Sequence, residues 1–416
     1  MDPKVFPFGE GTLRLLHACE QKVLPQFKRY EEIAQINQMK VIAAFQKNQV
    51  SSRHFNPSTG YGYGDEGRDK LADVFAAVFS ARAAIVSPML MSGTHAITTA
   101  LFGMLKPGEG VVSITGEPYD TLKSALSGSG SLREYGVEYY AVPLLSGGGV
   151  DFERVFALLR RHKAITTVYI QRSTGYEMRG AFTSDKIGEI IGTIKSEFPD
   201  KLFFVDNCYG EFVCDSEPTG VGADVAAGSL IKNPGGGLAP TGGYIAGSEA
   251  LIERIANRFS APGIGREIGS YAYGYQYFYQ GLFMAPHTVL QALKGVILAS
   301  AVFSELGYKT TPSFEEERGD ITQTIVFGNE ADLTAFVRGV QRASAVDGHV
   351  VPYAWDMPGY DDKVIMAAGT FVQGASLELT ADAPIRPPYC AYLQGALTYE
   401  HAKLGILFAL DALKKG

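Results

Sequence analysis

Between about residues 84 and 206, short apolar runs alternate with segments whose apolar residues recur at helical spacing. The apolar runs predict strands at 84–88, 111–115, 138–142, 165–171 and 201–206. The amphipathic segments predict helices at 91–105, 119–126, 151–161 and 184–198. An alternation of strands and helices is typical of a mainly parallel sheet with helices on both faces. Such sheets bind ligands at the carboxyl ends of their strands.

The same periodicity outlines the two ends of the chain. Residues 11–49 predict one or two amphipathic helices, an arm that packs on its own chain or on a partner subunit. Further helices are predicted at 69–79, 251–259, 287–306, 330–345 and 399–414, and further strands at 323–327 and 376–380. We therefore expect three parts, namely a helical arm at 1–60, a large cofactor-binding domain at 61–290, and a linker helix with a smaller α+β domain at 291–416.

Composition and charge exclude several classes of protein. The chain has 416 residues, of which 46% are hydrophobic and 19% charged, as in ordinary globular proteins. A formal net charge of −7 without any basic tract argues against nucleic-acid binding. The four cysteines show no close-spaced metal pattern, and we expect no membrane span because no apolar run approaches about 18 residues. The sequence therefore favours a cytoplasmic protein that binds neither nucleic acid nor membrane.

One lysine stands where chemistry is expected. An apolar run that begins near residue 224 stops at Lys232, a glycine-rich turn follows at 235–237, and a second apolar run begins at Tyr244. A lysine at the end of a strand, with small neighbours that let a flat ligand approach, suits a Schiff base with a carbonyl cofactor such as pyridoxal phosphate (PLP). A surface lysine in a turn is the alternative.

Three further positions offer what such a cofactor needs. Ser92, Gly93 and Thr94 open a predicted helix, whose free backbone N–H groups favour a phosphate, although an ordinary helix cap has the same pattern. Asp206 ends a predicted strand and suits a protonated pyridine nitrogen, or else it caps a turn. Tyr119 follows another strand, so its ring either stacks on a planar cofactor or covers hydrophobic surface.

Two loops add candidates for binding the substrate. Tyr61 and Tyr63 lie between glycines in a turn-rich loop, which is either a part of the site or only a connector. Arg386 lies between prolines, and its guanidinium suits either a substrate carboxylate or a structural salt bridge.

The order of these candidates along the chain is that of fold-type I PLP enzymes: phosphate-binding helix, ring, acid and lysine. The chain resembles the Cys/Met-metabolism family, which includes cystathionine β- and γ-lyases and methionine γ-lyase, and more closely its subgroup of cystathionine β-lyase-like proteins involved in aluminium resistance. The motifs that carry the resemblance span nearly the whole chain, at 60–68, 92–95, 205–211, 229–237, 261–265, 280–287 and 394–401.

The resemblance implies a fold-type I PLP-dependent transferase fold with a mainly parallel seven-stranded sheet. It also implies that Lys232 forms the Schiff base with PLP and that Asp206 pairs with the pyridine nitrogen. Tyr119 would stack on the ring, and the phosphate would be held at the helix opened by Ser92, through Gly93 and Thr94, and by Ser229. The glycines at 235–237 would let the backbone fold tightly beside the cofactor.

In the family, the loop equivalent to 60–68 reaches into a neighbouring subunit. The resemblance therefore implies that Tyr61 or Tyr63 completes the site of a partner, in a homodimer or homotetramer. This chain departs from the family pattern, because its loop reads Tyr-Gly-Tyr where the family usually has Tyr-x-Arg, and its arginine comes only at Arg68. Which residue replaces the cross-subunit phosphate arginine is left open.

The expected reaction is β- or γ-elimination from a sulfur-containing amino acid such as cystathionine, cysteine or methionine. Lys232 would remove the Cα proton, Tyr61 or Tyr63 would assist as acid or base, and Arg386 would hold the substrate carboxylate. Two alternatives stay open: a PLP-dependent aldolase acting on a β-hydroxy amino acid, and a non-catalytic PLP-fold protein in metal or stress tolerance. The sequence offers no His or Cys cluster that would chelate a metal.

Overall fold

The computed structural model describes residues 5–357 and 362–414 and contains two β-sheets. The larger sheet has seven strands in the order β1-β7-β6-β5-β4-β2-β3. Its strands are β1 (Ala83–Ser87), β2 (Gly110–Ser113), β3 (Glu138–Ala141), β4 (Ile165–Gln171), β5 (Leu202–Asp206), β6 (Val225–Ser229) and β7 (Gly243–Gly247). Strands β2 to β6 pair in parallel, and β7 pairs antiparallel with both β1 and β6. The predicted mainly parallel seven-stranded sheet is confirmed.

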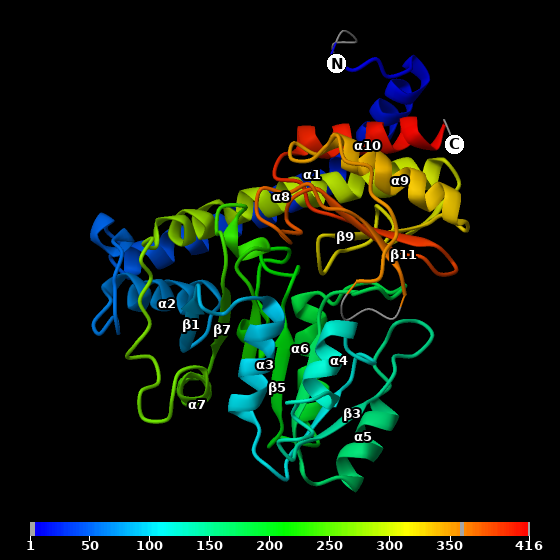
Figure 1. The fold of residues 1–416 in the computed structure, drawn as a ribbon. Helices are drawn as coiled ribbons and strands as arrows, with labels where there is room; N and C mark the ends of the chain where they lie inside the picture. The colour runs from blue at the N-terminus through cyan, green and yellow to red at the C-terminus, as the bar shows by residue number, and fades with distance from the viewer. Residues whose placement is uncertain (1–4, 358–361, 415–416) are drawn as a thin grey trace.

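Helices cover both faces of this sheet (Figure 1). One face packs against α3 (Gly93–Met104), α4 (Asp120–Ser127) and α7 (Glu249–Phe259), and the other packs against α5 (Phe152–Arg161) and α6 (Ser184–Lys195). Successive side chains of a strand pack into the apolar cores on opposite faces of the sheet. In β5, Phe204 packs on the first face, whereas Phe203 and Val205 pack on the second. This division follows from the two-residue repeat of a strand, which sends successive side chains to opposite faces.

Two long helices lie along each other and join the two halves of the molecule (Figure 1). The N-terminal arm is one continuous helix, α1 (Glu10–Lys47), with Pro25 inside it. The predicted linker helix begins earlier than expected and forms α8 (Gln276–Glu305). The expectation that no segment is long and apolar enough to cross a membrane was wrong for α8, in which an 18-residue window reaches a mean hydropathy of 1.4. However, 67% of its apolar window is buried, as expected for the central helix of a core.

The second sheet lies above the first and has the order β10-β11-β12-β9-β8, with all pairs antiparallel (Figure 1). Its strands are β8 (Lys309–Thr311), β9 (Thr322–Val326), β10 (Val364–Ala367), β11 (Thr380–Pro384) and β12 (Cys390–Gln394). Helices α9 (Glu330–Ala343) and α10 (Tyr399–Leu413) cover it. Helix α2 (Glu66–Val78) packs beside β1. The boundaries of the three predicted domains stay a prediction.

The strand predicted at 376–380 was wrong. Residues 376–379 form turns, and β11 begins only at Thr380. The turn is held by Glu378, whose carboxylate accepts hydrogen bonds from the backbone nitrogens of Phe371 (2.8 Å) and Val372 (3.0 Å). A buried glutamate that binds a loop backbone favours a turn over a strand, and the alternation of residue types does not reveal that contact.

Candidate active site

A cavity of about 410 Å³ opens at the carboxyl ends of β4, β5 and β6 and is closed from above by residues of the second sheet. Eight of the ten residues predicted for the site line it, and they come from segments spread over nearly 300 positions of the chain. These residues are Ser92, Gly93, Thr94, Tyr119, Asp206, Ser229, Lys232 and Arg386. The fold therefore brings together the groups that the sequence order suggested.

Lys232 is placed by the short connection between β6 and a single helical turn at Asn233–Gly235. Its Nζ atom lies 4.0 Å from the centroid of the Tyr209 ring. Burial by itself lowers the pKa of Lys232, whereas the negative charge that can form on neighbouring side chains raises it, and the net direction of the pKa is upward. The contributing neighbours are Cys208, Tyr209, Asp206 and Tyr119. Lys232 is thus an amine inside the cavity and not a surface lysine in a turn.

Asp206 is the last residue of β5 and is only 2% exposed. Its carboxylate accepts hydrogen bonds from the backbone N–H of Cys208 (3.1 Å) and from the hydroxyl of Tyr169 (3.4 Å). Burial raises the pKa of Asp206, and the positive charge of Lys232 opposes that shift. A carboxylate buried in this way gains from a cationic partner, which a protonated pyridine ring would supply.

The helix expected to bind phosphate begins at Gly93, and Ser92 is its cap. The Ser92 hydroxyl accepts a hydrogen bond from the backbone N–H of His95 (3.1 Å), so its oxygen satisfies the helix itself. A Cβ atom at Gly93 would lie 3.0 Å from the Cys208 sulfur and 3.4 Å from the Ser229 Cβ. Glycine at this position lets the start of the helix approach β6 closely, which leaves its backbone N–H groups facing the cavity beside Ser229.

Tyr119 is held in two places at the edge of the cavity. Its hydroxyl shares a hydrogen bond with the Thr94 hydroxyl (3.3 Å), and its backbone N–H donates to the side-chain oxygen of Gln171 (3.3 Å). The ring is therefore fixed next to the helix that Thr94 belongs to. This is the contact expected of a ring that stacks on a cofactor whose phosphate lies at the same helix.

Together these residues fit PLP. The cavity offers an amine for the aldehyde, a buried carboxylate for the pyridine nitrogen, a fixed ring for the face of the pyridine, and a helix start for the phosphate. Because Gly93 has no Cβ atom, the start of the helix lies close to β6 and stays open to a ligand.

Arg386 lines the cavity, and its guanidinium forms a 2.8 Å ion pair with Asp362. Both side chains remain partly exposed, with 48% and 35% of their surface accessible. The salt bridge that the sequence left open is therefore present, and the role of Arg386 in holding a substrate carboxylate stays a prediction.

Tyr61 and Tyr63 lie outside the cavity of their own chain. Their side chains are 72% and 68% exposed, and their rings are 5.6 Å apart. Arg68 fixes the loop by donating to the carbonyl oxygens of Gly62 (3.0 Å) and Gly269 (3.1 Å). This arrangement leaves both tyrosines facing outward, and their predicted role in a partner's site stays a prediction.

The glycines at 235–237 fold the chain tightly, but Gly236 and Gly237 face α8 and the segment between β12 and α10. A Cβ atom at Gly236, whose φ is 56°, would lie 2.2 Å from the carbonyl oxygen of Gly281. A Cβ atom at Gly237 would lie 2.5 Å from the Leu397 side chain. None of the three glycines is among the described residues that line the cavity. The expectation that they lie beside the cofactor was wrong in this respect.

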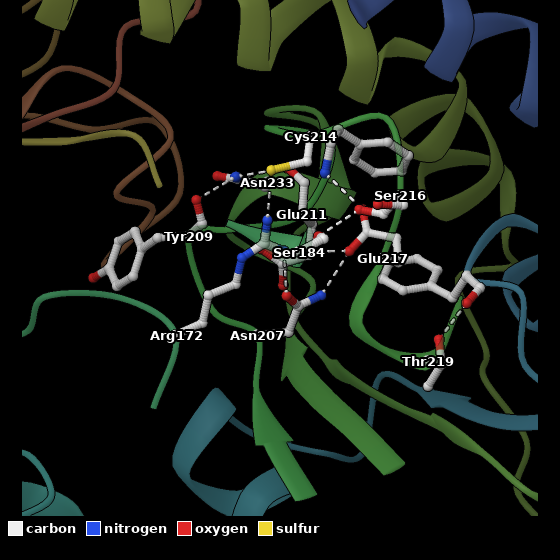
Figure 2. A network of polar contacts seen from close by, with 12 residues as sticks. Arg172, Ser184, Asn207, Tyr209, Glu211, Cys214, Ser216, Glu217, Thr219 and Asn233 are labelled. Atoms are coloured by element: carbon white, nitrogen blue, oxygen red, sulfur yellow. Dashed lines mark hydrogen bonds and ion pairs between the residues drawn. The ribbon is translucent and has the colours of Figure 1, made fainter. Parts of the chain in front are cut away.

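A buried polar network fixes the loop that follows β5, at residues 207–217 (Figure 2). Arg172 donates to the Asn207 side-chain oxygen (2.7 Å), and the Asn207 amide donates to Glu217 (2.9 Å). Farther along, the Asn233 amide donates to the carbonyl oxygens of Tyr209 and Glu211, both at 2.9 Å. The residue after Lys232 is therefore tied to the backbone of the loop that follows Asp206.

Several cavity residues were not singled out from the sequence as candidates for the site. They are Tyr209, Cys208, Gln171, Tyr176, Asp382 and Gln394. Tyr209 and Cys208 belong to the motif at 205–211, which carries the family resemblance. Their closeness to Asp206 in the sequence could therefore have identified them as site residues. Asp382 and Gln394 belong to β11 and β12, which pair with each other, and neither of these strands was predicted.

Comparison with known proteins identifies the class. The family model for methionine gamma-lyase matches residues 12–414, and the chain belongs to that family. A protein from Clostridium acetobutylicum, described provisionally as a cystathionine beta-lyase involved in aluminum resistance, is 48% identical, with a TM-score of 0.95 over 99% of this chain and 97% of the other. A carbon-sulfur lyase involved in aluminum resistance from Clostridium novyi NT is 47% identical, with a TM-score of 0.94 over 98% and 97%.

A curated relative extends the likeness. The Bacillus subtilis protein YnbB, described as uncharacterized, is 48% identical over 410 residues, which are 97% of each chain. The pyridoxal-5'-phosphate dependent protein YhfS from Escherichia coli is 15% identical, with a TM-score of 0.62 over 93% of this chain and 97% of the other. At that identity the likeness shows the fold alone. The chain thus has the fold-type I architecture that the resemblance implied.

Proposed function

We propose that this protein is a PLP-dependent carbon-sulfur lyase that acts on a sulfur-containing amino acid. The observation that carries the proposal is the common cavity of Lys232, Asp206 and the start of α3. Membership of the methionine gamma-lyase family and the close likeness to a carbon-sulfur lyase support the reaction class. Cystathionine, cysteine and methionine are the substrates to test first.

PLP bound in this cavity supplies an acceptor for the negative charge that develops at Cα when a proton leaves. The carboxylate of Asp206 stabilises the positive charge of the pyridine nitrogen, which strengthens that acceptor. The hydrogen bonds from Cys208 and Tyr169 hold the carboxylate in one orientation. The Tyr119 ring and the start of α3 hold the plane and the phosphate of the cofactor.

Lys232 supplies the proton transfers. Its amine, which lies inside the cavity, takes the proton from Cα of the bound amino acid. In a β-elimination the bond between Cβ and sulfur then breaks, and the sulfur leaves with its electron pair and acquires a proton as a thiol. Hydrolysis of the remaining fragment by one water gives a 2-keto acid and ammonia. Arg386 would orient the substrate carboxylate.

A panel of amino acids tests the reaction class. The purified protein with PLP is incubated with cystathionine, cysteine, methionine and threonine, and keto acids, thiols and aldehydes are measured. Keto acid together with thiol supports the lyase and identifies the substrate. Acetaldehyde and glycine from threonine would instead support the aldolase, and no product from any amino acid would support a non-catalytic role.

The Lys232→Ala variant tests the assignment of the lysine. We expect it to lose both the visible absorbance of the lysine-bound cofactor and the elimination activity. Lys201→Ala is a matched control, because Lys201 lies outside the cavity and pairs with Asp200 at 2.9 Å. An unchanged spectrum in Lys232→Ala would contradict the assignment.

We also propose that two copies of the chain share their sites in a homodimer or homotetramer. The exposure of the two neighbouring rings of Tyr61 and Tyr63 supports such an assembly, since large apolar side chains seldom cluster at a surface without a partner. A cytoplasmic location without nucleic-acid or membrane partners belongs to the same proposal. The four free cysteines, Cys19, Cys208, Cys214 and Cys390, fit that location.

A further inference from the structure

The upper wall of the cavity contains a carboxylate that the reaction described above does not use. Asp382 lies in the middle of β11 and lines the cavity together with Lys232. Its carboxylate is hydrogen-bonded by the Tyr176 side chain and by the amide nitrogen of Gln394, at 3.3 Å. Burial raises the pKa of Asp382 to about 6. At neutral pH this group is therefore predominantly a desolvated carboxylate, which a positive charge would stabilise.

Gln394 adds a second, independent feature. It is 5% exposed and lines the same cavity, and its side-chain oxygen has no hydrogen-bond partner. The orientation of the amide is defined, because the nitrogen donates to Asp382 and the oxygen must lie on the other side. A buried acceptor without a donor destabilises the protein, so a ligand that donates a hydrogen bond to this oxygen would gain affinity.

Two cations of the cavity have close partners other than Asp382, although the charge of Lys232 also acts on Asp382 and lowers its pKa. Arg386 pairs with Asp362 at 2.8 Å, and the Lys232 ammonium lies against the Tyr209 ring. The strands that carry Asp382 and Gln394 are held to the wall of the larger sheet, because the Tyr392 hydroxyl donates to the Tyr176 carbonyl oxygen at 2.6 Å. Asp382 and Gln394 are therefore fixed in the wall of the cavity that both residues line.

We propose that Asp382, Gln394 and Tyr176 form a subsite for a protonated amine in the side chain of the substrate. An ammonium group has three donors and no acceptor, so it can bind the Asp382 carboxylate and the Gln394 oxygen at once. The favoured substrates are then sulfur amino acids whose leaving thiol carries an amino group. This inference deepens the proposed function and rests on it for the reaction, but not for the binding.

Binding is tested with two amino acids that contain no leaving group. L-Lysine and L-norleucine have side chains of nearly equal length, and they differ in the terminal ammonium. We expect calorimetry on the PLP-loaded protein to give L-lysine at least a ~10-fold lower Kd, as one charge-assisted hydrogen bond provides. Asp382→Asn should remove the preference and leave the Kd of L-norleucine unchanged. Equal affinities in the unaltered protein would overturn the proposal.

Two further variants locate the effect. Gln394→Met removes the unpaired oxygen and should reduce the preference for L-lysine even if Asp382→Asn fails to fold. Glu177→Gln removes another carboxylate of the same cavity, one already paired with Arg179 at 3.3 Å, and should leave the preference intact. If Glu177→Gln abolishes the preference as fully as Asp382→Asn, the overall charge of the cavity and not the subsite is responsible, and the proposal is wrong.

The reaction is tested separately with S-(2-aminoethyl)-L-cysteine and S-propyl-L-cysteine, whose side chains have the same length and differ in the terminal ammonium. We expect the aminoethyl compound to have at least a ~10-fold higher kcat/KM, through a lower KM, and Asp382→Asn to equalise the two. If L-lysine is preferred but neither cysteine is cleaved, the subsite stands and the lyase assignment fails. If both are cleaved without preference and L-lysine binds no better than L-norleucine, the lyase stands and the subsite fails.

Discussion

The Nζ atom of Lys232 lies 4.0 Å from the centroid of the Tyr209 ring, inside the cavity that both residues line. The face of an aromatic ring stabilises an ammonium by about 0.5–2 kcal/mol. Tyr209→Leu should therefore lower the apparent pKa of the Lys232 amine by about 0.5–1.5 pH units. The pH profile of the rate at which cofactor-free protein binds PLP measures this change, since the neutral amine is the reactive form.

Tyr209→Phe separates the ring from its hydroxyl, which is 3.0 Å from the Ser376 hydroxyl. This variant keeps the ring and should leave the midpoint of the pH profile close to that of the unaltered protein. A shift as large as that of Tyr209→Leu would mean that the hydrogen bond to Ser376, and not the ring, determines the reactivity of Lys232. Both substitutions keep a side chain at the same φ of 71°, so backbone strain is equal in the two.

Glu211 makes the stability of the protein depend on pH. Burial raises the pKa of this carboxyl from 4.5 to about 8. Between these two values the folded state keeps a proton that the unfolded state has lost, so stability falls as pH rises. We expect Glu211→Gln to flatten this decrease by up to about 1.4 kcal/mol per pH unit. Denaturant titrations at pH 5, 6, 7 and 8 measure the slope.

Glu153→Gln is the matched control, because Glu153 is an exposed glutamate in the first turn of α5. It should leave the slope of stability against pH unchanged. Equal slopes in the unaltered protein and Glu211→Gln would contradict the prediction and would mean that Glu211 is ionised in the folded state.

Gly236→Ala tests the packing of the turn after Lys232 against α8. The new Cβ atom would lie 2.2 Å from the Gly281 carbonyl oxygen at a φ of 56°. We expect a loss of roughly 2–4 kcal/mol, the sum of the left-handed backbone cost and overpacking. Gly307→Ala has a φ of 88° with no atom within 4 Å of the Cβ, and should lose only about 1–2 kcal/mol. Equal losses in the two denaturation curves would contradict close packing at Gly236.

Subunit mixing tests whether a partner supplies Tyr61 and Tyr63. Lys232→Ala and a double Tyr61→Phe, Tyr63→Phe variant should each have little activity alone. After unfolding and refolding together, random pairing gives one intact site in half of the dimers, or roughly a quarter of full activity. Differently tagged subunits allow the mixed dimer to be isolated. A mixed dimer without activity would show that the tyrosines act within their own chain, and full activity of the double tyrosine variant alone would show that they have no role.

The sequence determined the part of the site that depends on local pattern. The apolar runs that end at Asp206 and near Lys232 are strands of one parallel sheet, whose carboxyl ends must meet at one edge. The start of α3 at Gly93 could also be predicted from local sequence. The capping residue Ser92 precedes it, and the apolar residues change there from the spacing of a strand to the spacing of a helix. These features follow from residues that are neighbours in sequence.

The tertiary structure alone decided which side chains face these groups from the second sheet. Asp382 and Gln394 come from strands that the sequence pattern missed, and the predicted strand at 376–380 is a turn held by the buried Glu378. The partner of Arg386 and the contact of Gly236 with α8 are also long-range. Local periodicity cannot encode such contacts, because they depend on how antiparallel strands register and pack after the chain has folded.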